Sequence, residues 1–474
     1  MDRQQGEGGQ VRLTPVTCNL KPFYDRTMND FAREFPARLR TAGVVGAGGA
    51  GFPAYVKASA KAEYVLVNAA ECEPLLKKDQ KLLEYYPEKV FDGLELMMRS
   101  TGAAKGVVGI KKKHEKLVKR LTEIARTRKN VSVALLGDYY PAGDEHCLVY
   151  DITGRLAPMG GIPLDVGCVV SNVETLYNAA LADKQPVTEK YITVAGAVEK
   201  PCTIKVPVGI TYAEAIEIAG GLKIKYAAGI DGGPMMGKVI TDFGTLVSKT
   251  SGGLIVLPKD HPLIVKKAMG RPAFSRIGQS VCDQCSLCTE LCPRYLLGHS
   301  IQPHRAMRSL LFSGGGRKIH SEYALLCCEC SLCTLYSCPE GLSPCEVCVA
   351  AKSDLREMKV GFKNSALNPG RAAAAHPVRE ERKVPVSKLI RRLGLADYNV
   401  DAPYLEHEYK PGRVRIQLSQ HIGVPCSAAV SLGASVKKGD VVGDLPADKL
   451  GCPVHASIDG KVSKINDKYV EIER

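Results

Sequence analysis

Two cysteine runs of nearly the same spacing constrain this chain of 474 residues more than any other feature. The first run spans residues 282–293 and reads C-x2-C-x2-C-x3-C-P, and the second spans 327–339 and reads C-x2-C-x2-C-x4-C-P. The first spacing is typical of a loop that holds a [4Fe–4S] cluster, and the second departs from it by one residue. Two runs therefore predict two clusters that lie close enough to exchange electrons.

The spacing also predicts which thiols bind which cluster. Three thiols spaced two residues apart can surround one cluster, while the fourth cysteine of each run usually reaches the cluster of the other run. Cys328 breaks this spacing and is left out, and Cys345 and Cys348 form a further C-x2-C pair that is either redox-active or spare. The predicted ligand sets are Cys282, Cys285, Cys288 and Cys338 for one cluster, and Cys292, Cys327, Cys330 and Cys333 for the other.

Zinc is the main alternative, because C-x2-C pairs also bind zinc. A structural zinc site needs four ligands, but it requires neither three evenly spaced cysteines nor a final Cys-Pro. A disulfide framework is typical of small secreted chains, and these cysteines are closely spaced in a long chain. The spacing therefore favours iron–sulfur clusters.

The length and the composition set further limits. The chain is too long for one hydrophobic core, which predicts three or four domains. No run of 18 apolar residues occurs, so no transmembrane helix is expected, and the polar residues 1–6 do not resemble a secretory signal. Eighteen cysteines without such a signal predict a reducing, cytoplasmic location.

The chain before the cysteine runs alternates between strand and helix patterns. Such alternation predicts a parallel sheet covered by helices on both faces. Ligands of these sheets bind where the strands end, and the polar segment 68–74 follows the first strand. The expected strands are 64–67, 106–110 and 131–136, and the expected helices are 82–99 and 114–128.

A glycine-rich segment precedes these strands. Residues 46–51 contain G-x-G-x-x-G, which lets the backbone approach a phosphate at the start of a helix. Residues 31–40 have a helical pattern where a dinucleotide fold would have a strand, so an ordinary glycine turn is the alternative. The later segment 232–239 nearly spells a P-loop, but it lacks the Ser or Thr for magnesium and Pro234 removes an amide. Triphosphate binding is therefore not expected.

Three motifs together resemble a known family. Residues 46–57 (GAGGAGFPAYVK), 68–74 (NAAECEP) and 171–176 (SNVETL) are similar to motifs of the flavin subunit of respiratory complex I, which bind FMN and admit NADH. Their combination with two cysteine runs is closer to the C subunit of the Rnf electron-transport complex and to the cobalamin reductases of propanediol-utilisation microcompartments. The resemblance extends from about residue 38 over nearly the whole chain. Ala70 departs from it, because complex I has an aspartate there, and this puts flavin contacts at that position in doubt.

The resemblance implies roles for individual residues. The glycines would cradle FMN, Lys57 would lie near its phosphate, Asn68 would touch the isoalloxazine, and Asn172 and Thr175 would hold the ribityl-phosphate side. Glu71 and Glu73 would line the nicotinamide pocket and take the catalytic role. The full set implied for FMN is Gly46, Gly48, Gly49, Gly51, Lys57, Asn68, Asn172 and Thr175.

The expected fold class is a multidomain α/β protein. The C-terminal place of the last module favours the microcompartment-type reductase, because the Rnf subunit carries that module at its N-terminus. Within it, His421 and His455 are either metal ligands or structural residues. The segments are an N-terminal lead-in (1–37), a Rossmann-like FMN and NADH domain (38–188), a β-grasp soluble-ligand-binding domain (189–262), an α-helical double [4Fe–4S] ferredoxin domain (270–358), a linker (359–402) and an all-β barrel-sandwich hybrid module (403–474).

These features predict an NADH-dependent oxidoreductase in which FMN converts a two-electron hydride into single electrons for two [4Fe–4S] clusters. The resemblance implies a corrinoid, or an enzyme that handles one, as the electron acceptor. It also implies a cytoplasmic location or a place inside a bacterial microcompartment, with shell proteins as partners. The alternatives are a peripheral electron-transfer subunit of an Rnf-like complex and a microcompartment docking protein. The chain lacks a D-x-H-x-x-G corrinoid motif, and Asp144-Glu-His146 is its nearest match.

The formal net charge of +14 does not by itself indicate a nucleic-acid partner. Two oxidised clusters at about −2 each and a flavin phosphate at about −2 would offset part of it. The chain has no basic patch interleaved with aromatic residues and no zinc-finger or RNA-binding signature. No nucleic acid is therefore expected to bind.

Overall fold

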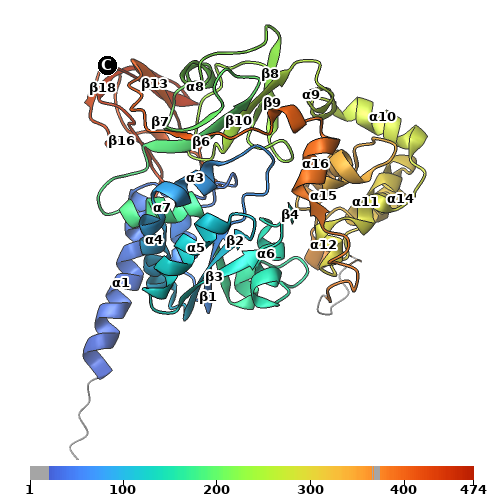
Figure 1. Ribbon diagram of the computed structural model, residues 1–474, viewed down its shortest axis with the longest axis horizontal. Coiled ribbons are helices and arrows are strands. Elements are labelled where there is room, and N and C mark those ends of the chain that lie inside the picture. Colours follow the sequence, from blue (N-terminus) through green and yellow to red (C-terminus); the bar gives the residue numbers. More distant parts are fainter. Residues whose placement is uncertain (1–20, 366, 368–373) are drawn as a thin grey trace, which may run out of the picture.

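The computed structural model of the chain describes residues 21–365, 367 and 374–474. Four parts follow one another along it: an N-terminal α/β domain, a β-grasp domain, a helical domain that carries both cysteine runs, and a C-terminal β-module (Figure 1). The first 20 residues of the predicted lead-in lie outside the described residues. The lead-in's remaining part begins helix α1 (Lys21–Thr41).

The N-terminal domain is built on a parallel sheet of four strands in the order β3-β2-β1-β5. Both faces of β1 are buried: Val65 and Val67 pack with helices on one face, and Leu66 packs on the other. The three predicted strands are confirmed, and β5 is a fourth that its apolar residues did not reveal. The bounds are β1 (Tyr64–Ala69), β2 (Lys105–Lys111), β3 (Val131–Leu136) and β5 (Cys168–Asn172).

Helices cover both faces of this sheet, as the alternating pattern predicts (Figure 1). The segment expected as one helix at 82–99 consists of two, because Pro87 cannot continue the first and opens the second. Gly102 ends that second helix in the left-handed conformation, with a φ of 69°. The helices are α2 (Ala54–Ala58), α3 (Lys78–Tyr85), α4 (Pro87–Thr101), α5 (Glu115–Arg126), α6 (Glu145–Thr153) and α7 (Val173–Leu181).

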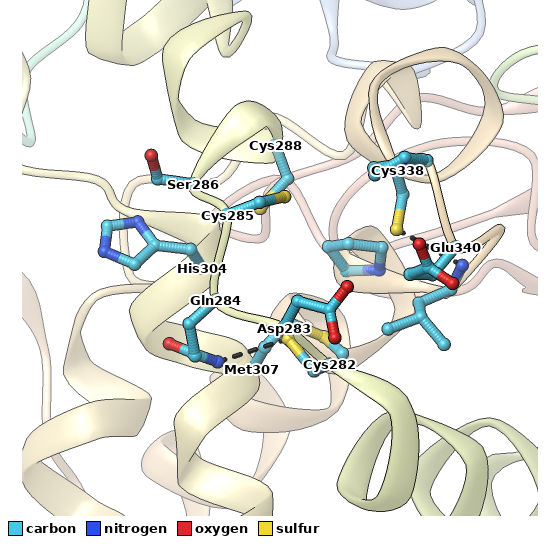
Figure 2. Close-up of a pocket in the computed structure, with 13 residues that line it drawn as sticks. Cys282, Asp283, Gln284, Cys285, Ser286, Cys288, His304, Met307, Cys338 and Glu340 are labelled. Carbon is cyan, nitrogen blue, oxygen red and sulfur yellow. Dashed lines mark hydrogen bonds between the residues drawn. The ribbon is translucent and has the colours of Figure 1, made fainter.

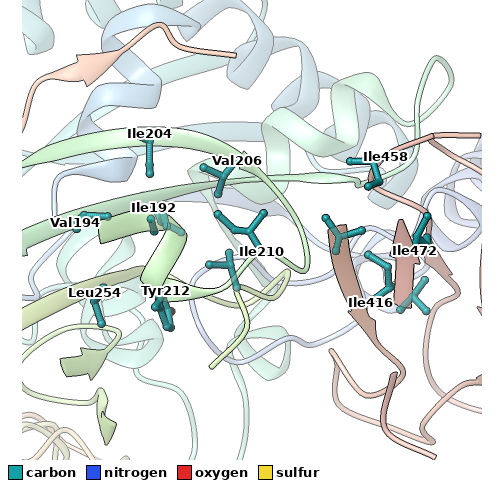
Figure 3. Close-up of a cluster of buried hydrophobic side chains, with 14 of the residues drawn as sticks. Ile192, Val194, Ile204, Val206, Ile210, Tyr212, Leu254, Ile416, Ile458 and Ile472 are labelled. Atoms are coloured by element: carbon teal, nitrogen blue, oxygen red, sulfur yellow. The ribbon is translucent and has the colours of Figure 1, made fainter. Parts of the chain in front are cut away.

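The β-grasp domain and the C-terminal module share one hydrophobic core. Ile192 and Val206 of the β-grasp sheet belong to the same buried cluster as Ile416 and Ile472 of the module (Figure 3). The β-grasp sheet has the order β12-β7-β6-β10-β8-β9, in which β12 (Tyr404–Leu405) comes from a later segment of the chain. The module folds as two sheets of four and three strands. The bounds in the β-grasp domain are β6 (Glu189–Gly196), β7 (Cys202–Pro207), α8 (Tyr212–Ile218), β8 (Ala227–Asp231), β9 (Lys238–Ile240) and β10 (Gly253–Pro258).

The C-terminal module consists of short antiparallel strands, in agreement with the barrel or sandwich expected there. Its bounds are β13 (Arg413–Gln417), β14 (Ser427–Ala428), β15 (Ser435–Val436), β16 (Val441–Asp444), β17 (Val454–His455), β18 (Gly460–Ile465) and β19 (Tyr469–Glu473). In Figure 1 this module lies on the opposite side of the molecule from the helical domain, although the two follow one another in the sequence.

The helical domain packs short helices around the two cysteine runs. Four of these helices begin with proline at the first position, which suits a first turn whose amide has no partner. The bounds are α9 (Pro262–Lys267), α10 (Arg271–Val281), α11 (Leu287–Glu290), α12 (Pro293–Leu296), α13 (Pro303–Arg308), α14 (Gly314–Glu322) and α15 (Pro344–Glu357), with a π-helix at Cys333–Ser337.

The segment between the helical domain and the C-terminal module is packed rather than free. Strand β11 (Val384–Pro385) pairs with β4 (Tyr139–Tyr140), α16 (Val386–Arg392) follows it, and β12 (Tyr404–Leu405) extends the β-grasp sheet beside β7. The segment thereby crosses back over the molecule, in orange in Figure 1, and ties three parts together. No helix among the described residues is both long and apolar enough to cross a membrane.

Lys249 lies where three of the four parts meet. Its ammonium is buried and donates to the carbonyl of Gly43 at 2.9 Å and to that of Pro453 at 3.0 Å. These carbonyls belong to the N-terminal domain and to the C-terminal module, and Lys249 itself belongs to the β-grasp domain. Burial lowers the pKa of Lys249 to about 8, and both acceptors of its ammonium are backbone carbonyls.

Replacing this lysine should loosen the junction. Lys249→Ala removes the donor for two carbonyls, and we expect the free energy of unfolding to fall by about 2–4 kcal/mol. Lys438→Ala is the control, because that half-exposed lysine pairs only with Glu189 across a domain boundary and should change stability by less than about 1 kcal/mol. Thermal midpoints and limited proteolysis of the C-terminal module measure both effects. Equal midpoints for the two variants would contradict the role given to Lys249.

Candidate functional site

The carboxyl ends of β1 and β5 form the switch point of the sheet, the place where the strand order changes direction. From β1 the sheet continues to β2 on one side and to β5 on the other, and ligands of open α/β sheets bind at such a point. Asn68 and Asn172 are register partners there, so the two predicted asparagines lie side by side at the ends of adjacent strands. The structure thus brings together residues that are 104 positions apart in the sequence.

The glycine loop lies over the same point. The amide of Ala47 donates to Thr175 Oγ1 at 3.0 Å, and a Cβ on Gly48 would lie 3.4 Å from that of Asn172. Gly49 has a φ of 116°, and a Cβ built on it would meet no heavy atom within 4 Å. The loop therefore presents open backbone to the space above the strand ends. As its upstream pattern predicts, it follows helix α1 rather than a strand.

A buried network of ion pairs contacts the glycine loop. The carboxylate of Glu174 pairs with Lys78 at 3.1 Å and with Lys190, and all three side chains are almost fully buried. Lys190 also donates to the carbonyl of Ala47 at 3.1 Å. Burial raises the pKa of Glu174, but the two lysines outweigh it and hold the pKa below its usual range. The network places two lysines close to the loop, and their charges are offset by Glu174 and by Asp79, which also pairs with Lys78.

Asp79 extends this network to the switch point. It pairs with Lys78 at 2.7 Å and accepts a hydrogen bond from Asn172 Nδ2 at 2.6 Å. Neither lysine of the network was predicted from the sequence. Nothing in their spacing indicates the site, since Lys190 lies in a strand of the next domain.

Glu71 and Glu73 follow β1 but face different partners. Glu71 accepts hydrogen bonds from the amides of Asp79 and Gln80 at 2.7 and 3.2 Å, next to the Asn172 contact. Burial, with repulsion from Asp79, raises the pKa of Glu71 to about 7. Glu73 instead accepts from two amides of the β-grasp turn at 235–236, at 2.8 and 2.9 Å. Glu71 therefore lies at the switch point, whereas Glu73 joins two domains, and the nicotinamide role of both stays a prediction.

Lys57 and Asn68 already have partners within the protein. Lys57 donates to Glu145 at 3.0 Å and to the carbonyl of Val170 at 2.7 Å. Asn68 donates to the carbonyl of Gly143 at 2.8 Å. Asn68 lies at the end of β1, and Lys57 lies on α2 and bonds to a carbonyl of β5. The predicted contacts of both residues with FMN stay predictions.

The first predicted ligand set lines one cavity of the helical domain. Figure 2 shows Cys282, Cys285 and Cys288 on one loop and Cys338 facing them from another segment. Gln284 Nε2 donates to the Cys282 sulfur at 3.1 Å, and the amide of Leu342 donates to the Cys338 sulfur at 3.3 Å. Four convergent thiols with N–H donors to sulfur fit a [4Fe–4S] cluster. Within the described residues, no three His, Cys, Asp or Glu side chains are placed to hold a single metal ion.

Both cysteine runs have the same unusual backbone. Gln284 and Ser286 in the first run have φ values of 58° and 66°, and Glu329 and Ser331 at the equivalent positions of the second have 60° and 59°. Non-glycine residues rarely adopt this conformation, and it concentrates at functional sites. The sequence repeat is therefore also a structural repeat.

A π-helix absorbs the extra residue of the second run. The amide of Cys338 donates to the carbonyl of Cys333 at 3.2 Å, a span of five residues. A π-turn fits one more residue into a helical turn, so Cys338 still reaches the first cavity despite the x4 spacing. The x4 spacing of the second run is therefore compatible with the predicted ligand set.

The second predicted ligand set, the second thiol group, is buried between the helical and N-terminal domains. Cys292, Cys330 and Cys333 are buried and Cys327 is partly buried. Cys330 lies near Cys292, and the backbone amides that follow Cys292 bond to its sulfur. The thiols omitted from the prediction are also here, with Cys328 next to Cys330 and Cys345 next to Cys333.

The loop 139–144 connects this second group to the switch point. Its Gly143 carbonyl accepts the hydrogen bond from Asn68, and its Tyr140 hydroxyl donates to the carbonyl of Cys330 at 2.8 Å. Tyr140 is fully buried. One short loop therefore contacts both a predicted flavin residue and a predicted cluster ligand.

The same loop also forms a buried ion pair next to Cys292, another member of the second thiol group. Asp144 pairs with Arg294 at 2.7 Å, and Arg294 lies two residues after Cys292. Arg294 and His146 outweigh burial and lower the pKa of Asp144, so the carboxylate stays charged. Asp144, considered in the sequence only as part of an incomplete corrinoid motif, instead caps helix α6 and holds the helical domain in place.

The fold and the two sites define a flavin and iron–sulfur protein of the electron-transfer class. Four family descriptions match in the expected order: the Nuo51 FMN-binding domain at residues 39–181, the SLBB domain at 191–239, the 4Fe-4S dicluster domain at 281–343 and the RnfC barrel sandwich hybrid domain at 401–473.

Curated relatives narrow the class to one family. The chain is 42% identical to cobalamin reductase PduS of Salmonella typhimurium, over 94% of this chain and 97% of that protein, and 41% identical to PduS of Citrobacter freundii over the same shares. It is 33% identical to the C subunit of the Na(+)-translocating ferredoxin:NAD(+) oxidoreductase complex of Acetobacterium woodii, over 60% of this chain and 63% of that protein. The chain belongs to the PduS cobalamin reductase family.

Substituting Gly49 should weaken FMN binding. Gly49→Ala places a methyl group on the open side of the loop and strains the backbone by about 1–3 kcal/mol, so we expect at least about a tenfold loss of affinity. Gly102→Ala is the matched control, because it also has a positive φ and open surroundings but lies at the opposite ends of the strands. FMN titration followed by flavin fluorescence measures both affinities. Equal affinities would contradict a role of the loop in holding the phosphate.

The raised pKa of Glu71 predicts a pH-dependent stability. The folded protein keeps a proton on Glu71 up to about pH 7, whereas an ordinary glutamate loses it near 4.5. The folded form therefore loses stability as the pH rises through this window. Relative to the wild type, Glu71→Gln should gain up to about 3 kcal/mol between pH 5 and pH 8, because it carries no buried charge. Thermal midpoints at both pH values test this, and a difference that does not change with pH would contradict it.

Proposed function

We propose that this protein is an NADH-dependent reductase that passes electrons from a flavin at the switch point, through two [4Fe–4S] clusters, to the cobalt of a corrinoid. Its support is the membership of the PduS family over almost the whole length of both chains. When bound, FMN accepts a hydride as two electrons and the clusters carry electrons one at a time.

The main structural support for this proposal is a continuous series of contacts from the flavin site to the thiol groups. Asn68 at the flavin site bonds to Gly143, and Tyr140 of the same loop bonds to Cys330 in the second thiol group. The first group follows within the helical domain, where the thiol of Cys285 is exposed. Electrons would therefore enter at the switch point, pass the buried second cluster and leave from the first cluster at the surface.

The residues of the switch point have positioning and electrostatic roles in this proposal. The glycine loop would receive the phosphate above Lys190 and Lys78, and Asn172 and Thr175 would hold the side of the cofactor next to the loop. Glu71 would line the nicotinamide pocket. Burial raises its pKa to about 7, so its carboxyl would be mostly neutral below that pH. Burial of the second thiol group excludes water from the middle of the path.

The location and the partners follow from the same family membership. A corrinoid or a corrinoid-handling enzyme would meet the protein near Cys285, since that thiol is exposed. We include the interior of a bacterial microcompartment, with shell proteins as neighbours, in the proposal. Fractionation of intact compartments with this protein retained inside them would support that part.

The deciding experiment is an anaerobic assay of the reconstituted protein with NADH and hydroxocobalamin, in which both spectra are followed together. We expect two one-electron reductions of cobalt for each NADH oxidised. Cys285→Ala should slow cobalamin reduction at least about tenfold while NADH still reduces the flavin, since the change lies at the exit of the path. Gly102→Ala is the control and should behave as the wild type.

Two results would contradict the proposal. Flavin and clusters that become reduced without turnover of cobalamin would mean that the acceptor is a different molecule. A Cys285→Ala variant with an unchanged rate would mean that electrons do not leave through the first cluster.

A further inference from the structure

The second thiol group contains more sulfur than one cluster needs. In the first cavity, the four predicted ligands are the thiols among its lining residues. Around the second run, the thiol of Cys345 contacts those of Cys327 and Cys333 and lies near that of Cys330. Cys345 therefore faces all three cysteines of the run, which is the arrangement required of a fourth ligand.

Cys345 is held firmly in this place. It is the second residue of α15, its side chain is buried, and its amide donates to Thr334 Oγ1 at 2.9 Å. The Ser331 hydroxyl approaches its sulfur at 3.8 Å. Thr334 and Ser331 belong to the second run itself, so the run and the start of α15 form one unit.

Cys292 approaches the same run from the other side. Its sulfur lies near Cys328 and Cys330 and receives the amides of Arg294 and Tyr295. Cys330 thus has three further thiols near it: its chain neighbour Cys328, Cys292 before α12, and Cys345 on α15. The spacing of the sequence selects Cys292, and the contacts in the structure add Cys345.

We propose that Cys345 is a reserve ligand of the second cluster and can take the fourth coordination position in place of Cys292. This inference rests on the proposed function, which places a cluster there. In the exchange, one iron–sulfur bond to Cys292 breaks and one to Cys345 forms, while the proton of the Cys345 thiol passes to the Cys292 sulfur. No oxidation or reduction accompanies the step. The residues that line the first cavity include no fifth thiol, although Cys345 shares a buried cluster with Cys288.

The inference predicts a difference between the two fourth ligands. The wild type should hold about eight iron atoms per chain after anaerobic reconstitution with iron and sulfide. Cys292→Ala and Cys345→Ala should each retain about eight, and the double variant should retain about four. Cys338→Ala is the matched control, because it removes the fourth ligand of the first cluster and should leave about four. Iron and sulfide analysis and the spin count of the dithionite-reduced protein give these numbers without an activity assay.

The variants also separate the possible failures. The four iron atoms retained by the double variant, together with unchanged FMN binding, show that the chain is folded. Loss of the second cluster in Cys292→Ala alone, or about eight iron atoms in the double variant, would overturn the reserve role of Cys345. A wild type with only about four iron atoms would overturn the two-cluster proposal itself and this inference with it.

Discussion

The buried carboxylate of Glu174 fixes the geometry on which the candidate flavin site depends. It accepts from Lys78 of α3 and from the amide of Tyr191 at 3.0 Å, and it pairs with Lys190 of β6. The glycine loop depends on it too, since Lys190 bonds to the carbonyl of Ala47. Removing one partner from a buried ion pair typically costs about 3–5 kcal/mol, because the other charge is left uncompensated. One carboxylate therefore sets the positions of the loop, two helices and the next domain.

A second constraint is that the helical domain must meet the N-terminal domain in one orientation. The loop 139–144 satisfies it with two polar contacts, from Tyr140 to the Cys330 carbonyl and from Asp144 to Arg294. Both contacts are buried, so a rotation of either domain would leave polar groups without partners. The returning segment adds an independent tie, because Arg379 pairs with Asp151 at 2.8 Å. Such contacts hold the thiol groups at a fixed separation from the switch point, which electron transfer requires.

Local patterns predicted much of this fold, and non-local contacts account for what they missed. Strands β1, β2 and β3 and helix α5 of the N-terminal domain follow from apolar periodicity, whereas β5 does not. Asn68 and Asn172 meet because parallel strands end at one edge. The partners of Glu174 come from another helix and another domain, so no spacing rule connects them. Strand β12 lies at the start of the segment expected as the C-terminal module (403–474), yet it extends the β-grasp sheet. Two residues carry no periodicity, and the strand exists only through its pairing with β7. The roles of individual residues toward FMN and NADH stay predictions.

The two cysteine runs show why a rule on cysteine spacing can identify the right residues although the spacing varies by one residue. A cluster constrains where thiols lie in space, and the sequence constrains only how many residues separate them. The first run meets the constraint with a short helix, α11, between Cys288 and Cys292, and the second meets it with a π-helix that contains one more residue. Both runs have left-handed residues at the same positions before their helical turns. The two runs therefore share the conformation of the loop and differ in the helix that follows it. A thiol brought in from outside the run, as Cys345 is by the start of α15, satisfies the same spatial constraint with no spacing signal at all.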